Sequence, residues 1–228
     1  MSEQVRVSVI MPTLNEAPRV RDLLGDLAAG PEIGLELIVA DGGSADGTPD
    51  LARPLADLVL ATGRGRAVQM NAGARAARGV YLWFLHADTR VSPEALAALG
   101  AACGAGARWG RFDVRLSGRQ PLLRLVERLM NLRSCLTGIA TGDQGIFVTR
   151  ADFEAAGGYP EIPLMEDIAL SRALRRRARP LCLKTPIETS SRRWEERGVL
   201  RTILLMWRLR LAYALWADPS QLARRYDA

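Results

Sequence analysis

The alternation of short apolar runs with amphipathic segments constrains the fold of this chain more than any other feature. In the first hundred residues, β-branched or aliphatic runs alternate with stretches whose apolar residues recur at helical spacing. This alternation predicts βαβ units and a parallel sheet. We expect strands at residues 5–11, 35–40, 58–61 and 80–85, and helices at residues 18–29, 48–54, 66–78 and 93–103.

The second half of the sequence is less regular. It predicts a strand at residues 109–116, placed at a sheet edge, and another at 145–149. The expected helices are residues 121–136, 151–156, 165–177 and 199–216. Because no internal repeat, low-complexity tract or clear linker interrupts the 228 residues, we expect one α/β domain.

The charge of the chain favours anionic partners. The net charge is +6, the isoelectric point is about 9.9, and Lys184 is the only lysine. Such a balance attracts nucleotide phosphates, nucleic acid or acidic membrane surfaces. An arginine-rich genome composition explains the same total, so the positions of the arginines matter more than their sum.

The cysteines and the N-terminus predict a compartment. Cys103, Cys135 and Cys182 are odd in number and far apart in sequence, which argues against a disulfide framework and a zinc cluster and suits a reducing cytoplasm. The first residues lack the pattern of a secretory signal, and no run of 18 apolar residues is present. We expect a cytoplasmic protein, with the cytoplasmic face of a membrane as an alternative location.

Polar clusters follow three of the expected strands. Residues 12–16, 41–48 and 86–88 each contribute a carboxylate, namely Glu16, Asp41 and Asp88. The carboxyl ends of parallel strands share one edge of a sheet, where ligands bind. Helix capping and plain turns explain each cluster singly. All three together favour a cleft in which carboxylates hold a hard cation.

These segments resemble a known family. Residues 7–16 followed by residues 39–48 look like the opening of the family 2 glycosyltransferases, and residues 65–73 resemble its next segment. His86-Ala87-Asp88 stands where the family has its metal-binding D-x-D motif. Glu166-Asp167 resembles its later E-D motif, and residues 190–194 resemble Q-x-x-R-W. The match runs from about residue 5 to residue 194.

The resemblance implies a GT-A fold, a Rossmann-like and mostly parallel sheet flanked by helices. It implies a nucleotide-sugar-binding half at residues 1–105, an acceptor-side half at 106–198 and a C-terminal helical segment at 199–228. The implied activity is inverting transfer of a sugar from a UDP- or GDP-sugar to an acceptor hydroxyl, by one displacement assisted by Mn²⁺ or Mg²⁺. The acceptor is open: lipid-linked and small soluble molecules both fit.

The resemblance also implies a set of site residues. Asp167 would be the catalytic base, Asp88 would bind the metal, and Glu166, Arg193 and Trp194 would lie on the acceptor side. The implied donor-binding residues are Pro12, Thr13, Asn15, Glu16, Asp41, Gly43, Ser44, Arg66, Asn71, His86 and Ala87.

Three positions depart from the family pattern. Gly42 replaces the usual second acidic residue, which puts the donor base in doubt, and Ser190 replaces the glutamine of the last motif. His86 replaces the first acid of D-x-D. As the only histidine, it is a candidate metal ligand, a candidate ribose contact or a packing residue, and as a ligand it would suit Mn²⁺ somewhat better than Mg²⁺.

A separate glycine-flanked turn carries the second candidate base. Asp143 and Gln144 lie between Gly142 and Gly145, just before an expected strand. This pattern fits a plain polar turn and a functional site equally well. In the functional interpretation both side chains contact the acceptor or the transferred sugar, and Asp143 is the alternative to Asp167.

Residues 199–217 have two interpretations. The segment is strongly apolar but contains Arg201, Arg208 and Arg210. It either packs on the sheet or a partner subunit with its arginines extended outward, or lies in a membrane interface with its arginines at lipid headgroups.

Other classes of function fit less well. An NAD(P)-dependent oxidoreductase needs G-x-G-x-x-G after the first strand, where this chain has residues 12–16. A nucleic-acid-binding module needs aromatic residues among its basic ones, and the expected strands offer few. A non-catalytic nucleotide-sugar sensor and a metal-dependent nucleotidyltransferase remain the alternatives.

Overall fold

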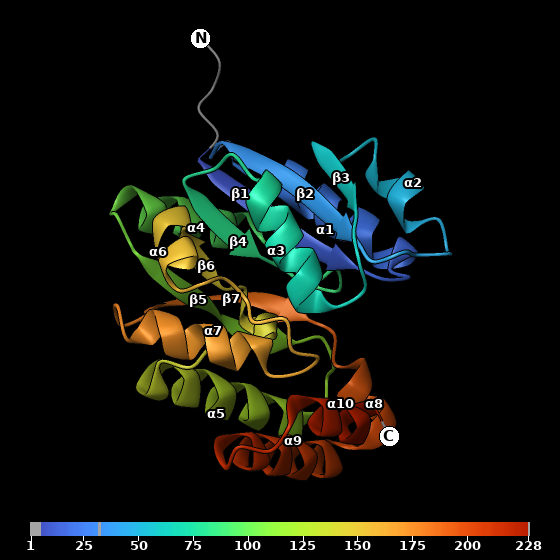
Figure 1. Ribbon diagram of the computed structural model, residues 1–228, viewed down its shortest axis with the longest axis vertical. Coiled ribbons are helices and arrows are strands. Elements are labelled where there is room, and N and C mark those ends of the chain that lie inside the picture. The colour runs from blue at the N-terminus through green and yellow to red at the C-terminus, as the bar shows by residue number, and fades with distance from the viewer. Residues whose placement is uncertain (1–5, 32, 228) are drawn as a thin grey trace.

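A seven-stranded mixed sheet organises the protein (Figure 1). The computed structural model describes residues 6–31 and 33–227. The strands lie in the order β3-β2-β1-β4-β6-β5-β7. They span Val7–Thr13 (β1), Leu35–Asp41 (β2), Leu58–Ala61 (β3), Tyr81–Phe84 (β4), Trp109–Leu116 (β5), Phe147–Thr149 (β6) and Leu181–Thr189 (β7). This is an α/β sheet, mostly parallel in its first half, as expected from the sequence.

The first four strands are parallel, as the alternation predicts. β1 pairs with β2 and β4, and β2 pairs with β3, all in parallel. β6 runs antiparallel to both β4 and β5, while β5 and β7 are parallel to each other. The carboxyl ends of β1, β2 and β4 therefore meet at one edge, where the polar clusters lie.

Helices cover both faces of the sheet because consecutive strand residues point to opposite sides. Val9 and Met11 of β1 pack with α1 (Ala17–Ala28) and α4 (Pro93–Gly104). Ile10, between them, packs with α3 (Arg66–Ala76), α6 (Arg150–Ala155) and α7 (Glu166–Arg175) on the other face. The short helix α2 (Thr48–Ala52) follows the 41–48 loop.

The C-terminal part adds a helical layer below the sheet (Figure 1). It contains α5 (Pro121–Thr137), α8 (Arg192–Arg197), α9 (Val199–Ala214) and α10 (Pro219–Asp227). Leu209 of α9 and Leu222 of α10 pack against Met165, which precedes α7, and Ile168, which lies in it. Val199 packs with Leu123 and Val126 of α5. None of the helices in the described residues is both long enough and apolar enough to cross a membrane.

Two expectations from the sequence are wrong. Residues 109–116 do not form an edge strand, because β7, which the sequence analysis did not predict, pairs along β5 and takes the edge. The cysteines do form one disulfide: Cys135 on α5 is joined to Cys182 on β7, with their Cα atoms 6.0 Å apart. Cys103 is free and buried. The cysteines therefore no longer support a reducing compartment.

Candidate functional site

The ends of β1 and β2 are held together by one buried carboxylate. Asp41 Oδ1 accepts hydrogen bonds from Thr13 Oγ1 (3.0 Å) and Ser44 Oγ (2.5 Å). Its Oδ2 accepts from the backbone N–H groups of Gly43 (3.0 Å) and Ser44 (2.8 Å). Burial opposes ionisation, but these hydrogen bonds outweigh it and lower the pKa of Asp41. A nucleobase N–H would have to displace one of these donors to reach Asp41.

Asn15 and Asp46 fix the loop above this carboxylate. Asn15 has a φ of 56°, in the left-handed region that asparagine tolerates. Its N–H donates to Ser44 Oγ (2.8 Å), and its side-chain oxygen accepts from the N–H of Ala45 (2.9 Å). Asp46 accepts from the N–H of Ala17 (3.0 Å), at the start of α1. The loops after β1 and β2 are thus joined by hydrogen bonds into one prearranged surface around Asp41, which we call the Asp41 wall.

Gln69 is a residue of this wall that sequence analysis missed. It is buried on α3, and its Nε2 donates to the carbonyls of Thr13 (2.6 Å) and Ala40 (2.8 Å). A Cβ at position 42 would lie only 3.1 Å from that nitrogen. The close approach gives a physical reason for Gly42 at the position where the family pattern has an acid.

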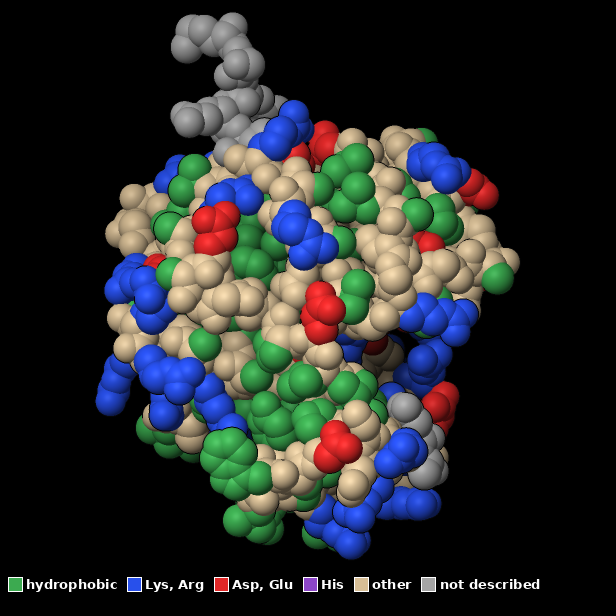
Figure 2. All heavy atoms as spheres, in the orientation of Figure 1, with side chains coloured by type: hydrophobic (Ala, Val, Ile, Leu, Met, Phe, Trp, Pro, Cys, Tyr) green, Lys and Arg blue, Asp and Glu red, His purple; other side chains and the backbone are tan. Residues whose placement is uncertain are grey.

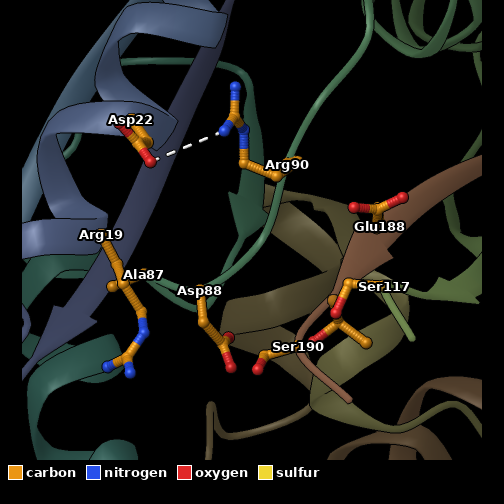
Figure 3. Close-up of a pocket in the computed structure, with 9 residues that line it drawn as sticks. Arg19, Asp22, Ala87, Asp88, Arg90, Ser117, Glu188 and Ser190 are labelled. Carbon is orange, nitrogen blue, oxygen red and sulfur yellow. Dashed lines mark ion pairs between the residues drawn. The ribbon is translucent and has the colours of Figure 1, made fainter. Parts of the chain in front are cut away.

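Asp88 lies in an open cavity beyond the end of β4 (Figure 3). The cavity is also lined by Arg19 and Ala87, and by Ser117 and Ser190 from the opposite side. Burial raises the pKa of Asp88, and the nearby Asp143 and Glu16 carboxylates raise it further against the opposing charges of His86 and Arg19. Glu16 itself forms an ion pair with Arg19 at 2.6 Å.

The side chains around Asp88 offer a divalent cation few protein ligands. The carboxylates of Asp88, Asp143 and Glu16 repel one another, and a divalent ion would reduce that repulsion. A carboxylate is a suitable ligand for Mg²⁺ or Mn²⁺. Among the described residues, however, no group of three His, Cys, Asp or Glu side chains is arranged to hold a metal. Asp88 would therefore be a single protein ligand, and further ligands would have to come from outside these side chains.

The imidazole of His86 contacts the turn that carries Asp143. Its Nδ1 lies 3.4 Å from Asp143 Oδ1, and a Cβ at Gly142 would approach its Nε2 to 2.6 Å. Burial opposes protonation of the imidazole, but Asp143 outweighs it and raises the pKa of His86. Both ring nitrogens therefore face the 142–144 turn, and the metal-ligand interpretation would require the ring to reorient.

The E-D motif forms the first turn of α7. Arg66 Nε, at the start of α3, forms an ion pair with Glu166 Oε1 at 2.9 Å. Glu166 is buried, its Oε2 has no hydrogen-bond partner in the described residues, and burial raises its pKa. Asp167 accepts hydrogen bonds from the N–H groups of Gly142 (2.9 Å) and Ile168 (2.7 Å). The positive end of the α7 dipole favours negative charge at this point.

Arg193 joins this cluster from α8. Its guanidinium carbon lies 3.8 Å from the ring centroid of Tyr226 on α10. Burial opposes ionisation of Asp143, but His86, and then Arg66 and Arg193, outweigh it and lower its pKa. Asp143, Glu166, Asp167, Arg66 and Arg193 therefore share one electrostatic environment, although their sequence positions span 128 residues.

Three of the expected site residues serve packing or backbone contacts. Gln144 is buried, and its side-chain oxygen accepts from the N–H of Thr141 within the turn Gly142–Gln144. Asn71 exchanges two hydrogen bonds with the backbone of Tyr159 (2.8 and 3.0 Å). Trp194 packs on the apolar cluster of Leu116, Leu123, Val126 and Val199. In this arrangement, contact of Gln144 with an acceptor, or of Asn71 with a donor, would require these side chains to move.

The sequence model of "Glycosyl transferase family 2" matches residues 8–134, more than half of the chain. The chain belongs to glycosyl transferase family 2. The match includes the Asp41 wall, Asp88 and most of α5, but not residues 188–190, which also line the cavity. A comparison with curated proteins gave no match.

Several solved structures share this fold. The mannosyltransferase PcManGT from Pyrobaculum calidifontis, in complex with GDP-Man and Mn²⁺, superposes with a TM-score of 0.67 at 23% identity, covering 99% of this chain and 70% of that one. S. aureus TarS 1–349 gives 0.64 at 21% identity, over 82% of this chain and 60% of that one. Glucosyl-3-phosphoglycerate synthase from Mycobacterium tuberculosis, with Mn²⁺, UDP and glucosyl-3-phosphoglycerate, gives 0.58 at 21%, over 81% and 70%. The chain thus spans less than two thirds of the TarS chain.

Proposed function

We propose that the protein transfers a sugar from a UDP- or GDP-sugar to an acceptor hydroxyl, with inversion at the anomeric carbon. Membership of family 2 supports glycosyl transfer. Structural neighbours in complex with UDP, UDP-GlcNAc and GDP-Man support a nucleotide-sugar donor. The observation that carries the proposal is the Asp88 carboxylate, which lines a cavity at the same strand edge as the Asp41 wall.

In this proposal the base and ribose lie against the loops after β1 and β2. Thr13, Glu16 and Ser44 shape that pocket, and Arg19 lies beside the cavity of Asp88. In the same proposal Arg66, which also pairs with Glu166, offers positive charge to the phosphates. A Mn²⁺ or Mg²⁺ ion held by Asp88 would neutralise the diphosphate as it leaves.

Asp167 is the proposed catalytic base. Its carboxylate removes the proton of the acceptor hydroxyl, and that oxygen bonds to the anomeric carbon as the bond to the diphosphate oxygen breaks. The hydrogen bond from Gly142 fixes its orientation. Asp143 is the second candidate, but His86, Arg66 and Arg193 lower its pKa, which makes it a weaker proton acceptor.

A thermal-shift screen tests this function. UDP-, GDP- and dTDP-sugars are each added with and without Mn²⁺, and the proposal expects stabilisation by one donor class that depends on the metal. No stabilisation by any nucleotide-sugar would overturn it. Because His86 replaces the first acid of D-x-D, the alternative of a non-catalytic sensor is tested by hydrolysis of the binding donor: a sensor binds it without turnover.

A further inference from the structure

Two helices on the lower face of the molecule expose apolar stripes to solvent. On α9, Leu200, Leu204, Trp207 and Leu211 are each more than 60% exposed and recur every three or four residues. Leu215 and Trp216, just past the end of the helix, are also exposed. On α5, exposed leucines recur at the same spacing, at positions 125, 129, 132 and 136. Helical residues at this spacing share one face.

The two stripes belong to adjacent helices. Val199 and Ile203 of α9 pack with Leu123, Val126 and Met130 of α5 in one apolar cluster, so the helices are neighbours. Figure 1 shows α9 below α5. Figure 2 shows hydrophobic side chains gathered at this end of the molecule, with arginines beside them. Contiguous exposed apolar side chains rimmed by charged ones mark an interaction site.

The charged residues of the same two helices are almost all positive. Each carries three arginines, at positions 124, 128 and 133 of α5 and at positions 201, 208 and 210 of α9. Glu127 is the only acid on either helix, and it is buried and pairs with Arg124 at 2.9 Å. Arg128, Arg201 and Arg208 are exposed and lie at the edges of the stripes.

We infer that the α5–α9 face docks on an anionic lipid surface. Exposed leucines and tryptophans enter the boundary between headgroups and acyl chains, while long arginine side chains reach the negatively charged headgroups. A second copy of the chain complements this face less well, because a symmetric dimer would bring arginine-rich surfaces together without an exposed acid on either helix to neutralise them.

The face is continuous with elements of the site. α8 and α10, which bring Arg193 and Tyr226 together, both pack on α9. Docking through α5 and α9 would therefore hold the acceptor side of the cleft near the lipid surface. The inference concerns binding alone and holds whether or not the proposed sugar transfer is correct.

Vesicle flotation of the full-length protein tests the inference. Vesicles of phosphatidylcholine alone are compared with vesicles that also contain phosphatidylglycerol. The protein should float with the anionic vesicles, and added salt should weaken binding. The double variant Leu204→Glu with Leu211→Glu should lose binding by at least about ten-fold. Arg201→Gln and Arg208→Gln should each weaken it by about five-fold.

A matched pair of exposed apolar residues provides the control. Leu55 and Val80 are 40% and 55% exposed and lie outside α5 and α9, so Leu55→Glu with Val80→Glu should still float. Circular dichroism checks that each variant is folded. Failure of the wild type to bind anionic vesicles, or equal binding by the α9 variant, would overturn the inference. So would light scattering that shows a dimer that the α9 variant converts to monomers.

Discussion

The Asp167 carboxylate accepts a hydrogen bond from the backbone N–H of Gly142, at 2.9 Å. This contact ties the start of α7 to the turn that carries Asp143, so the two candidate bases are held by neighbouring parts of one scaffold. Asp143 in turn faces His86, at 3.4 Å. The two carboxylates therefore differ in partner: Asp167 is bound by backbone amides, and Asp143 faces an imidazole side chain.

Asp167→Asn should slow sugar transfer about 10²–10⁴-fold, the usual effect of losing a general base. Asparagine keeps an oxygen that can accept from Gly142, so the local structure and donor affinity should be retained. Steady-state kinetics together with calorimetry of UDP or GDP binding separate the two effects. Loss of donor binding in this variant would place Asp167 in the donor site instead.

Asp143→Asn should have the smaller effect on transfer, because Asp143 is already stabilised as an anion by His86, Arg66 and Arg193. We expect a rate within about 10-fold of wild type, below the range for a general base. If Asp143→Asn shows the large loss and Asp167→Asn does not, the two assignments must be exchanged.

Asp88→Asn should weaken metal-dependent binding of the nucleoside diphosphate at least about 10-fold, since loss of a direct ligand costs no less than loss of an outer-shell partner. The comparison is calorimetry of UDP and GDP with and without Mn²⁺. Asp22 lines the same cavity but pairs with Arg90, so Asp22→Asn is the matched control and should retain affinity. An unchanged affinity in Asp88→Asn would remove this residue from the metal site.

The first half of the fold is readable from sequence because each strand there is a continuous apolar run between turn residues. β3 was predicted at its observed bounds, and β1, β2 and β4 within two residues over the described part of the chain. β7 was missed because Lys184 and Pro186 interrupt its apolar pattern. Its pairing with β5 tolerates the proline next to a register shift at Phe112 and Asp113. The edge position assigned to β5 was wrong for the same reason.

The candidate site was predictable only where it follows local motifs. Asp41 is the last residue of β2, and Glu16 and Asp88 follow β1 and β4 within about four residues, so topology alone predicts that the three share one edge of the sheet. The pairing of Arg66 with Glu166, and that of His86 with Asp143, join distant segments through tertiary packing. Gln69 shows no local signal for its role, because only the folded structure places its amide beneath the ends of two strands.

Gln69→Ala should lower the free energy of unfolding by about 1–3 kcal/mol, because two buried carbonyls lose a donor. Urea denaturation measures the change. Gln221, exposed on α10, provides the control, and Gln221→Ala should leave stability within about 0.5 kcal/mol of wild type. Equal stability of the two variants would mean that water replaces the Gln69 amide.

Asp152 should make the protein sensitive to acid. Hydrogen bonds from Arg108, and then from Arg177 and Thr149, outweigh burial and hold the pKa of Asp152 far below its usual range. A group with a depressed folded-state pKa contributes stability above its unfolded pKa of about 3.9 and loses it as the pH falls toward the folded value. The wild type should therefore lose this contribution progressively below about pH 5.

Asp152→Asn should lower the melting temperature at about pH 7 and flatten its fall between about pH 5 and pH 3, because the amide cannot titrate. Circular dichroism melts across this range measure both effects. Asp50 pairs with Arg53 on the surface, where an ion pair adds little stability, so Asp50→Asn should follow the wild-type curve. If Asp152→Asn also follows that curve, other carboxylates govern the acid sensitivity, and the ion pairs of Asp152 with Arg108 and Arg177 contribute little to folding.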